Sequence, residues 1–338
     1  MHFVIFLHIQ LSFAFPLFTT CASVLGRTSS AIQTSNPSFS LYASNRDQGS
    51  CSPWCEISSL PAAKLTVILP AYNEESRIQE TINQYGTYLT ESQIWGRDRG
   101  RWCEILVVDD GSTDDTISAV HQCSQRIKGV EITCLSLEQN EGKGSAVARG
   151  IHAVRSGYNL QNSENTGIIL VADADGSGDI QYLDSMMSEL SSLVQSSMDG
   201  MNDDNVLPWE TKAMIVGNRD GNTSLSRIIT RWGFRKLVKI ICGDLQVDDT
   251  QCGFKMMTLN AGLTLYSELN LKRWTHDVEV LYRAKELGVP VTGMNIGWVD
   301  KEGSKLASTL GETIYMSGIM LSEIIFMRIQ YIFGRWVV

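Results

Sequence analysis

Residues 65–75 read LTVILPAYNEE, and this stretch sets a pattern that the rest of the chain repeats. Its first part is apolar and rich in β-branched residues, and it stops at Pro70, which predicts a short buried strand. After Glu75 the apolar residues recur at helical spacing, at Ile78, Ile82, Tyr85 and Leu89. The stretch therefore predicts a strand followed directly by a helix.

The strand-then-helix unit occurs three more times. Apolar runs at 105–108, 130–137 and 168–172 are each followed by a segment with apolar residues at helical spacing. We expect the acidic segment 195–212 to be a surface loop, and a further strand to follow at 213–217. Strands that alternate with helices imply a parallel sheet covered by helices. The sequence thus predicts an α/β fold with a mostly parallel central sheet and helices on both faces.

Polar side chains follow each predicted strand. Open α/β sheets bind ligands just beyond the carboxyl ends of their strands, so these residues mark the candidate site. The candidate site residues are Pro70, Tyr72 and Glu74 after the first strand, Asp109 and Asp110 after the second, Lys143 within NEGKG after the third, and Asp173 and Asp175 after the fourth.

Asp173 and Asp175 are separated by one residue at the end of a predicted buried strand. Two carboxylates that point into one crevice need a counter-charge, which a divalent cation can provide. Oxygen ligands of this kind suit Mg²⁺ or Mn²⁺, and such an ion usually keeps other positions for water and substrate phosphate. We therefore predict a Mg²⁺ or Mn²⁺ site at Asp173 and Asp175; the alternative is that both acids cap a helix start.

The other strand ends carry groups that fit a nucleoside diphosphate. Asp110 can accept the ring N–H of a uracil or guanine, Tyr72 can pack on the base, and Glu74 can hold ribose hydroxyls. Lys143 lies between two glycines and suits a phosphate. For each of these residues the alternative is ordinary turn or helix-cap duty.

Several function classes are excluded. The chain has no G-x-x-x-x-G-K-[ST] motif and no G-x-G-x-x-G that opens the first helix, which disfavours P-loop NTPases and nicotinamide dehydrogenases. The formal net charge of −9 and the absence of a long basic run argue against nucleic acid as a partner. The eight cysteines form no pair of closely spaced C-x-x-C couples, so a zinc site is not indicated and a reducing compartment fits best.

The two ends differ from the catalytic body, which we place at 62–310. Residues 1–26 lack Asp, Glu, Lys and Arg and are long enough to cross a bilayer, which takes about 20 apolar residues. We expect a membrane anchor or a signal segment there, and a Ser/Thr-rich linker at 27–61. Residues 311–338 are predicted to form an amphipathic membrane-associated helix, because 314–338 is apolar and aromatic but carries Glu323, Arg328 and Arg335; packing on the protein's own core is the alternative.

Three motifs together resemble glycosyltransferase family 2 enzymes of the GT-A fold: PAYNEE at 70–75, VVDDGSTD at 107–114 and DADG at 173–176. Four later segments narrow the resemblance to dolichyl-phosphate β-glucosyltransferases, over roughly residues 62–336: NEGKG at 140–144, DTQCGFK at 249–255, RWTHDVE at 273–279 and EGSKL at 302–306. Where that group usually carries an aromatic residue before the aspartate of the Arg-Trp segment, this chain has His276, and where it has a small residue and Thr, this chain has Ser177 and Gly178.

The resemblance implies transfer of glucose from UDP-glucose to dolichyl phosphate with inversion, for protein N-glycosylation. It also implies an enzyme anchored in the endoplasmic reticulum membrane with its catalytic domain facing the cytosol. Residue by residue, it implies catalytic roles for Asp175, Asp277 and Arg219; donor binding by Pro70, Tyr72, Glu74, Asp110, Lys143 and Asp173; and an acceptor side with Asp249, Gln251, Arg231 and Trp274.

A phosphate acceptor would already be largely anionic near neutral pH, because its second pKa is about 6. A sugar hydroxyl would instead need a general base, for which Asp277 is the candidate. The basic residues Arg227, Arg231, Arg235, Lys236 and Lys239 either line the acceptor path or form a solvated helix face. Three alternatives stay open: GDP-mannose as the donor, another membrane-bound acceptor, and a nucleotide-sugar-binding module without catalysis.

Overall fold

The computed structural model describes residues 64–92, 94–95, 102–157, 167–199, 211–220, 225–299 and 310–338. The predicted anchor or signal segment (1–26) and linker (27–61) lie outside these residues. None of the helices in the described ranges is both long and apolar enough to span a bilayer.

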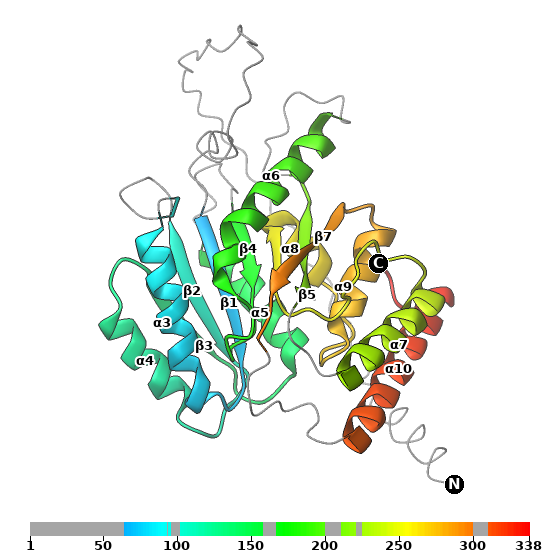
Figure 1. Ribbon diagram of the computed structural model, residues 1–338, viewed down its shortest axis with the longest axis horizontal. Coiled ribbons are helices and arrows are strands. Elements are labelled where there is room, and N and C mark those ends of the chain that lie inside the picture. The colour runs from blue at the N-terminus through cyan, green and yellow to red at the C-terminus, as the bar shows by residue number, and fades with distance from the viewer. Residues whose placement is uncertain are drawn as a thin grey trace, which may run out of the picture. The chain divides into compact units, whose positions relative to one another are not determined.

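A seven-stranded sheet forms the centre of the described part of the chain (Figure 1). In chain order the strands are β1 (Lys64–Ala71), β2 (Cys103–Asp109), β3 (Glu131–Ser136), β4 (Gly167–Val171), β5 (Met214–Asp220), β6 (Lys255–Thr258) and β7 (Val291–Gly297). Across the sheet their order is β3-β2-β1-β4-β6-β5-β7. β6 is antiparallel to both of its neighbours and every other pairing is parallel, which confirms the predicted mostly parallel sheet.

Helices cover both faces of the sheet, as predicted (Figure 1). One face carries α3 (Glu75–Glu91), α4 (Thr116–Arg126) and α6 (Leu183–Asp199), with the short helix η2 (Ile180–Tyr182) between α3 and α6. The other face carries α5 (Lys143–Gly157) and α8 (Leu259–Tyr266), on which α9 (His276–Glu286) packs. Two further helices, α7 (Leu225–Cys242) and α10 (Leu310–Ile332), pack against each other, and α10 also packs on α9.

The predicted core face of α3 is confirmed, since Ile78, Ile82, Tyr85 and Leu89 are all completely buried. Burial of a side chain of this size contributes about 1.5–3 kcal/mol relative to its exposure. The parallel register pairs Ala71 of β1 with Asp109 of β2. The residues that follow these strands therefore emerge at the same edge of the sheet.

The prediction of a loop from residue 195 was wrong at its start, because α6 continues to Asp199. The last turns are polar yet remain helical: Ser196 and Ser197 donate their hydroxyls to carbonyls four residues earlier, and Gln195 donates to Asp199 at 3.0 Å. Nothing in this stretch breaks a helix before Gly200, and an acidic composition alone does not end one. The strand predicted to follow is β5.

Candidate active site

The turn after β4 carries Asp173 and Asp175, and α3 holds this turn in place. Thr81 donates to one backbone carbonyl of the turn at 2.9 Å, and Tyr85 donates to a second at 2.7 Å. Both donors lie on the buried face of α3, so the turn is tied to the core. The side chains of Asp173 and Asp175 remain 23% and 25% exposed, which leaves them accessible to a ligand.

The segment before β6 lies directly against Asp173. A Cβ atom added to Gly253 would come within 2.2 Å of Asp173 Oδ1 and within 2.5 Å of the carboxyl carbon. Only glycine allows this approach without displacing the carboxylate. The DTQCGFK motif is thus in contact with the predicted metal-binding turn.

Lys143 reaches Asp173 from the start of α5. Its Nζ lies 2.5 Å from Asp173 Oδ1 and 5.6 Å from the centre of the Trp274 ring. Burial favours the neutral amine, but the carboxylates of Asp173 and Asp277 outweigh it, and the pKa of Lys143 is raised above its usual value. The lysine predicted to meet a donor phosphate is therefore a cation held beside the predicted metal-binding turn.

On the donor side, Glu74 forms a two-pronged ion pair with Arg77. Arg77 Nε and Nη2 donate to the two carboxylate oxygens of Glu74, both at 2.7 Å. The remaining guanidinium nitrogen, Nη1, lies 3.7 Å from Asp175 Oδ2. Arg77 thus links Glu74 to the turn after β4, a contact that the sequence did not reveal; the predicted contact of Glu74 with ribose stays a prediction.

Asp110 fastens the loop that leads to Lys143. The backbone N–H groups of Glu141 and Gly142 donate to its two carboxylate oxygens at 2.8 and 2.9 Å. Burial raises the pKa of Asp110, and these two hydrogen bonds offset part of that effect. Each carboxylate oxygen has a second lone pair, so the predicted contact with a base remains chemically open.

Tyr72 and Pro70 also lie at this edge of the sheet. Tyr72 is 38% exposed, as a residue that packs on a base should be. Next to it, Asn73 adopts a left-handed conformation with φ of 52°. Asn73 accepts a hydrogen bond from the Thr113 backbone N–H at 2.8 Å, which joins the loops after β1 and β2.

Arg219, a predicted catalytic residue, forms an ion pair with Asp249, a predicted acceptor-side residue. Arg219 Nε and Nη2 donate to the two oxygens of Asp249 at 2.5 and 2.9 Å. The guanidinium also lies 5.4 Å from the centre of the Trp298 ring. Burial alone would lower the pKa of Arg219, but the hydrogen bonds and charge of Asp249 outweigh burial and raise the pKa above its usual value, so the guanidinium stays charged. Asp249 Oδ1 in turn accepts the backbone N–H of Gln251 at 3.1 Å, which places these predicted acceptor-side residues together.

Asp277 is buried between two basic side chains. Lys255 Nζ lies 2.6 Å from Asp277 Oδ1, and His276 Nε2 lies 3.1 Å from the same oxygen. Burial opposes ionisation of the carboxyl group, but His276 and Lys255 outweigh it and hold the pKa of Asp277 far below its usual range. The other ring nitrogen of His276, Nδ1, lies 2.7 Å from the Arg273 carbonyl oxygen, so both ring nitrogens have polar partners. A carboxylate held in this way is a poor general base.

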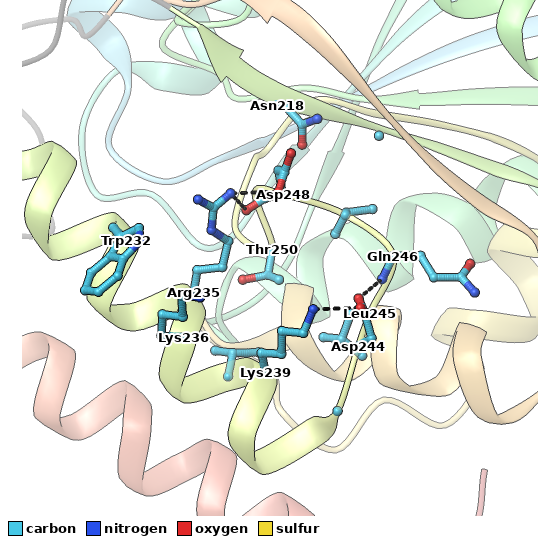
Figure 2. Close-up of a pocket in the computed structure, with 14 residues that line it drawn as sticks. Asn218, Trp232, Arg235, Lys236, Lys239, Asp244, Leu245, Gln246, Asp248 and Thr250 are labelled. Atoms are coloured by element: carbon cyan, nitrogen blue, oxygen red, sulfur yellow. Dashed lines mark hydrogen bonds and ion pairs between the residues drawn. The ribbon is translucent and has the colours of Figure 1, made fainter.

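A pocket of about 530 Å³ opens beside the acceptor-side residues (Figure 2). Its lining includes Asn218 and Thr250, the neighbours of Arg219 and Asp249, but none of the predicted donor-binding residues. On its α7 side it carries the described members of the basic run, Arg235, Lys236 and Lys239. Arg227 and Arg231 lie outside the residues whose side chains are described.

The basic residues of this pocket are largely compensated. Arg235 pairs with Asp248 at 2.8 Å and Lys239 with Asp244 at 2.7 Å, while the Lys236 ammonium lies 5.7 Å from the Trp232 ring centre. Both ion pairs are substantially exposed, and such pairs contribute only about 0–1 kcal/mol. A stronger anion can therefore replace either carboxylate at little cost.

The donor set at Asp173 and Asp175 fits a divalent cation with open positions. No group of three or more His, Cys, Asp and Glu side chains converges within the described residues, so protein ligands alone do not enclose an ion. Asp173 uses one oxygen for Lys143, and Asp175 uses one for the Ser177 backbone N–H at 3.0 Å. Each carboxylate has a second hard oxygen, and that of Asp175, Oδ2, also lies 3.7 Å from Arg77 Nη1. Such oxygens suit an ion that shares its coordination with water and phosphate.

Three residues of the site were missed or undervalued in the sequence. Arg77 stands three positions after Glu74, which is the spacing of side-chain neighbours on a helix and could have indicated the ion pair. Lys255 gave no such signal, because a lysine that is 1% exposed within a strand can only be understood from its tertiary partners. His276 was noted only as a departure from the expected aromatic residue.

The fold and the polar residues that follow its strands lie in a part of the chain that matches a known family. The family described as "Glycosyl transferase family 2" matches residues 66–238. The chain belongs to glycosyltransferase family 2, as its motifs indicated.

Within that family the chain is similar to dolichyl-phosphate β-glucosyltransferases. It is 31% identical to the one from Homo sapiens over 285 residues, which cover 82% of this chain and 78% of the relative. It is 30% identical to the one from Saccharomyces cerevisiae over 281 residues, or 80% of this chain and 75% of the relative. The narrower resemblance is thereby confirmed as well.

The fold has a solved counterpart in glucosyl-3-phosphoglycerate synthase from Mycobacterium tuberculosis, crystallised with Mn²⁺ and UDP-glucose. The TM-score is 0.52 at 16% identity, with 83% of this chain and 84% of that chain covered. At this identity the likeness is one of fold, and it confirms the predicted GT-A architecture.

The buried Asp277 cluster generates a prediction about stability and pH. Asp277→Asn should lower Tm at pH 7, because Lys255 and His276 lose their counter-charge; breaking a buried pair costs about 3–5 kcal/mol. The pKa of Asp277 is lower in the folded chain than its unfolded value of about 3.9, so its contribution is complete above that value and is lost as pH falls. The Tm difference between the two proteins should therefore shrink steadily between about pH 4 and pH 2.

Thermal melting followed by circular dichroism across this pH range measures the effect. The control is Asp199→Asn, since Asp199 is exposed at the end of α6 and its loss should leave Tm unchanged. A Tm difference that stays constant from pH 7 to pH 2 would contradict the assignment of Asp277 as an ionised, ion-paired carboxylate.

Proposed function

We propose that this protein transfers glucose from UDP-glucose to dolichyl phosphate with inversion, at the cytosolic face of the endoplasmic reticulum membrane, and so forms dolichyl β-D-glucosyl phosphate for protein N-glycosylation. The similarity to named dolichyl-phosphate β-glucosyltransferases over four fifths of the chain supports this choice of substrates. In the reaction an oxygen of the acceptor phosphate attacks C1 of glucose from one side while the bond to the UDP oxygen breaks on the other.

The proposal rests on one observation: both carboxylates of the predicted acceptor side are held by basic side chains. Asp249 is bound by Arg219, and Asp277 is bound by Lys255 and His276. A sugar hydroxyl acceptor needs a general base with a pKa near the working pH, and Asp277 is far from that condition. A phosphate monoester has a second pKa of about 6 and needs no base. The acceptor side therefore favours a substrate that brings its own anionic nucleophile.

On the donor side, the turn after β4 suits the diphosphate. Asp175 and Asp173 would hold a Mg²⁺ or Mn²⁺ ion, which supplies positive charge to the departing UDP. Lys143 would pass from Asp173 to a donor phosphate, a short movement for a flexible side chain already at the site. Tyr72 and Asp110 would bind the uracil, and Arg219 would screen the two phosphate groups from one another.

The surface formed by α7 and α10 supports attachment to a membrane. The two helices lie side by side (Figure 1). Together with the residues that follow α10 they expose Trp232, Leu237, Ile240, Tyr315, Ile325, Phe326, Ile329, Ile332, Phe333 and Val337. Such an apolar surface is typical of helices that lie in the headgroup layer of a bilayer. Glu323 and Arg328, two of the charged residues of α10, turn inward to α9 and do not interrupt this surface.

A transfer assay tests the proposed substrates directly. Detergent-solubilised protein with radiolabelled UDP-glucose and dolichyl phosphate should give a labelled, organic-extractable product, whereas radiolabelled GDP-mannose under the same conditions should give none. An equal concentration of unlabelled GDP-mannose should leave glucose transfer unchanged. Mannose transfer with no glucose transfer would contradict the proposed donor, and glucose transfer only to a lipid without phosphate would contradict the acceptor.

Removal of the Asp277 carboxylate distinguishes the two classes of acceptor. Asp277→Asn should retain activity within about 100-fold of the wild type, because no proton has to be removed from a lipid phosphate. A required general base would give a loss of about 1000-fold or more. The measurement is kcat with saturating dolichyl phosphate, at a temperature at which circular dichroism shows the variant to be folded.

The cation site can be tested by substitution and by chelation. Asp175→Ala should lower kcat/KM by about 1000-fold, equivalent to about 4 kcal/mol of transition-state stabilisation. Binding of Mn²⁺, followed by electron paramagnetic resonance in the presence of UDP, should weaken in parallel. Asp199→Ala removes an exposed carboxylate elsewhere and serves as the control. Full activity of the wild type in excess EDTA would show that this assignment is incorrect.

A further inference from the structure

The inner side of α10 contacts the turn that carries the acceptor-side residues. Thr275 Oγ1 donates to Glu323 Oε2 at 2.5 Å, across 48 positions of sequence. Thr275 is completely buried, and it stands between Trp274 and His276, two positions before Asp277. Glu323 is therefore bonded to the middle of the 274–277 turn.

The direction of this hydrogen bond is unusual for a threonine in this position. Thr275 is the N-cap residue of α9, and a threonine at an N-cap normally accepts a hydrogen bond from a backbone N–H in the first turn of its own helix. Here the side chain makes no such bond and donates to Glu323 instead. The hydroxyl thus connects two helices and does not stabilise the end of one.

Further contacts fix α10 along α9. Tyr331 donates to Glu279 at 2.8 Å, and Arg328 donates to the hydroxyl of Tyr282. Near Glu323, the sulfur of Met320 lies 3.9 Å from the side-chain nitrogen of the acceptor-side residue Gln251. One face of α10 therefore reaches both acceptor-side segments, 249–253 and 274–277.

The side of α10 turned away from Glu323 exposes the apolar side chains Ile325 and Ile329. These follow Glu323 by two and six positions, which places them more than about 90° around the helix from the carboxylate, whereas the exposed Phe326, three positions on, lies nearer the side of Glu323. A lipid phosphate would arrive from the apolar side and meet the turn that Glu323 holds. Within the described part of the chain, the hydrogen bond of Glu323 goes to Thr275 and not to a donor-side residue.

We propose that Glu323 is a positioning residue for the acceptor: its hydrogen bond to Thr275 fixes the 274–277 turn to α10 in the arrangement that binds the lipid phosphate. This inference rests on the proposed function, since it concerns the binding of that acceptor. It assigns Glu323 no contact with the reacting atoms. It requires only that the turn, with Trp274 and Asp277, be held at a fixed place relative to α10.

The test compares Glu323→Ala and Glu323→Gln in the transfer assay. Glu323→Ala should raise KM for dolichyl phosphate about tenfold, the effect of about one lost charge-assisted hydrogen bond, while KM for UDP-glucose changes less than about twofold. Glu323→Gln should restore most of the affinity, because its amide oxygen still accepts from Thr275. Ser322→Ala is the matched control, since Ser322 is exposed on the same turn and donates to the backbone carbonyl of Ile319.

A double-mutant cycle shows whether the hydrogen bond itself is responsible. Thr275→Val keeps the shape of the side chain but removes the hydroxyl, and combined with Glu323→Ala it should add no further increase in KM for dolichyl phosphate. Equal increases in KM for both substrates, or fully additive effects in the double variant, would overturn the inference. If Glu323→Ala does not fold, Glu323→Gln, which keeps the hydrogen bond, can be compared with Thr275→Val, which removes it; only Thr275→Val should then raise KM for dolichyl phosphate. Absence of transfer by the wild-type protein would instead refute the proposed function.

Discussion

Each of four carboxylates near the carboxyl end of this sheet has a basic side chain beside it, and these ion pairs hold the site together. Lys143 lies against Asp173, Arg77 near Asp175, Arg219 against Asp249, and Lys255 with His276 against Asp277. The partners come from different elements, so each ion pair also joins two parts of the chain. Charge compensation thereby does two things at once, because it permits a dense acidic site and it determines the relative positions of the loops that form it.

Much of this arrangement could be predicted from the sequence where the signal was local. The apolar period of 65–89 gave β1 and α3, and the polar residues after each strand pointed to the edge where the site lies. The tertiary partners could not be predicted in this way. β6 has only four residues, KMMT, too few for a pattern, and its lysine is buried because Asp277 neutralises it. The last turn of α6 could not be predicted from composition, because acidic residues after Val194 indicate a loop but do not end a helix.

Helix α9 shows the same limit most clearly. Its sequence, HDVEVLYRAKE, is that of a solvated surface helix, yet His276, Asp277, Glu279 and Arg283 are all buried. The Glu279 carboxylate, for example, accepts hydrogen bonds from the Leu271 backbone N–H and from the hydroxyl of Tyr331. Burial of a charged residue depends on partners far away in the sequence, and periodicity contains no information about them. The chemical state of Asp277, which decides between two classes of acceptor, was for this reason visible only in the structure.

The reversed direction of β6 has a consequence for how the chain is threaded. In a parallel strand, the residues that follow the strand lie at the carboxyl edge of the sheet. In β6 the residues that precede the strand lie there, because its first residue, Lys255, pairs with Val171 at the end of β4. The path from β5 to β6 therefore starts and finishes at the same rim, and α7 is an excursion from that rim. Such an excursion can change in length or surface chemistry without altering any strand pairing, so the surface around α7 is free to vary while the sheet that carries the site stays the same.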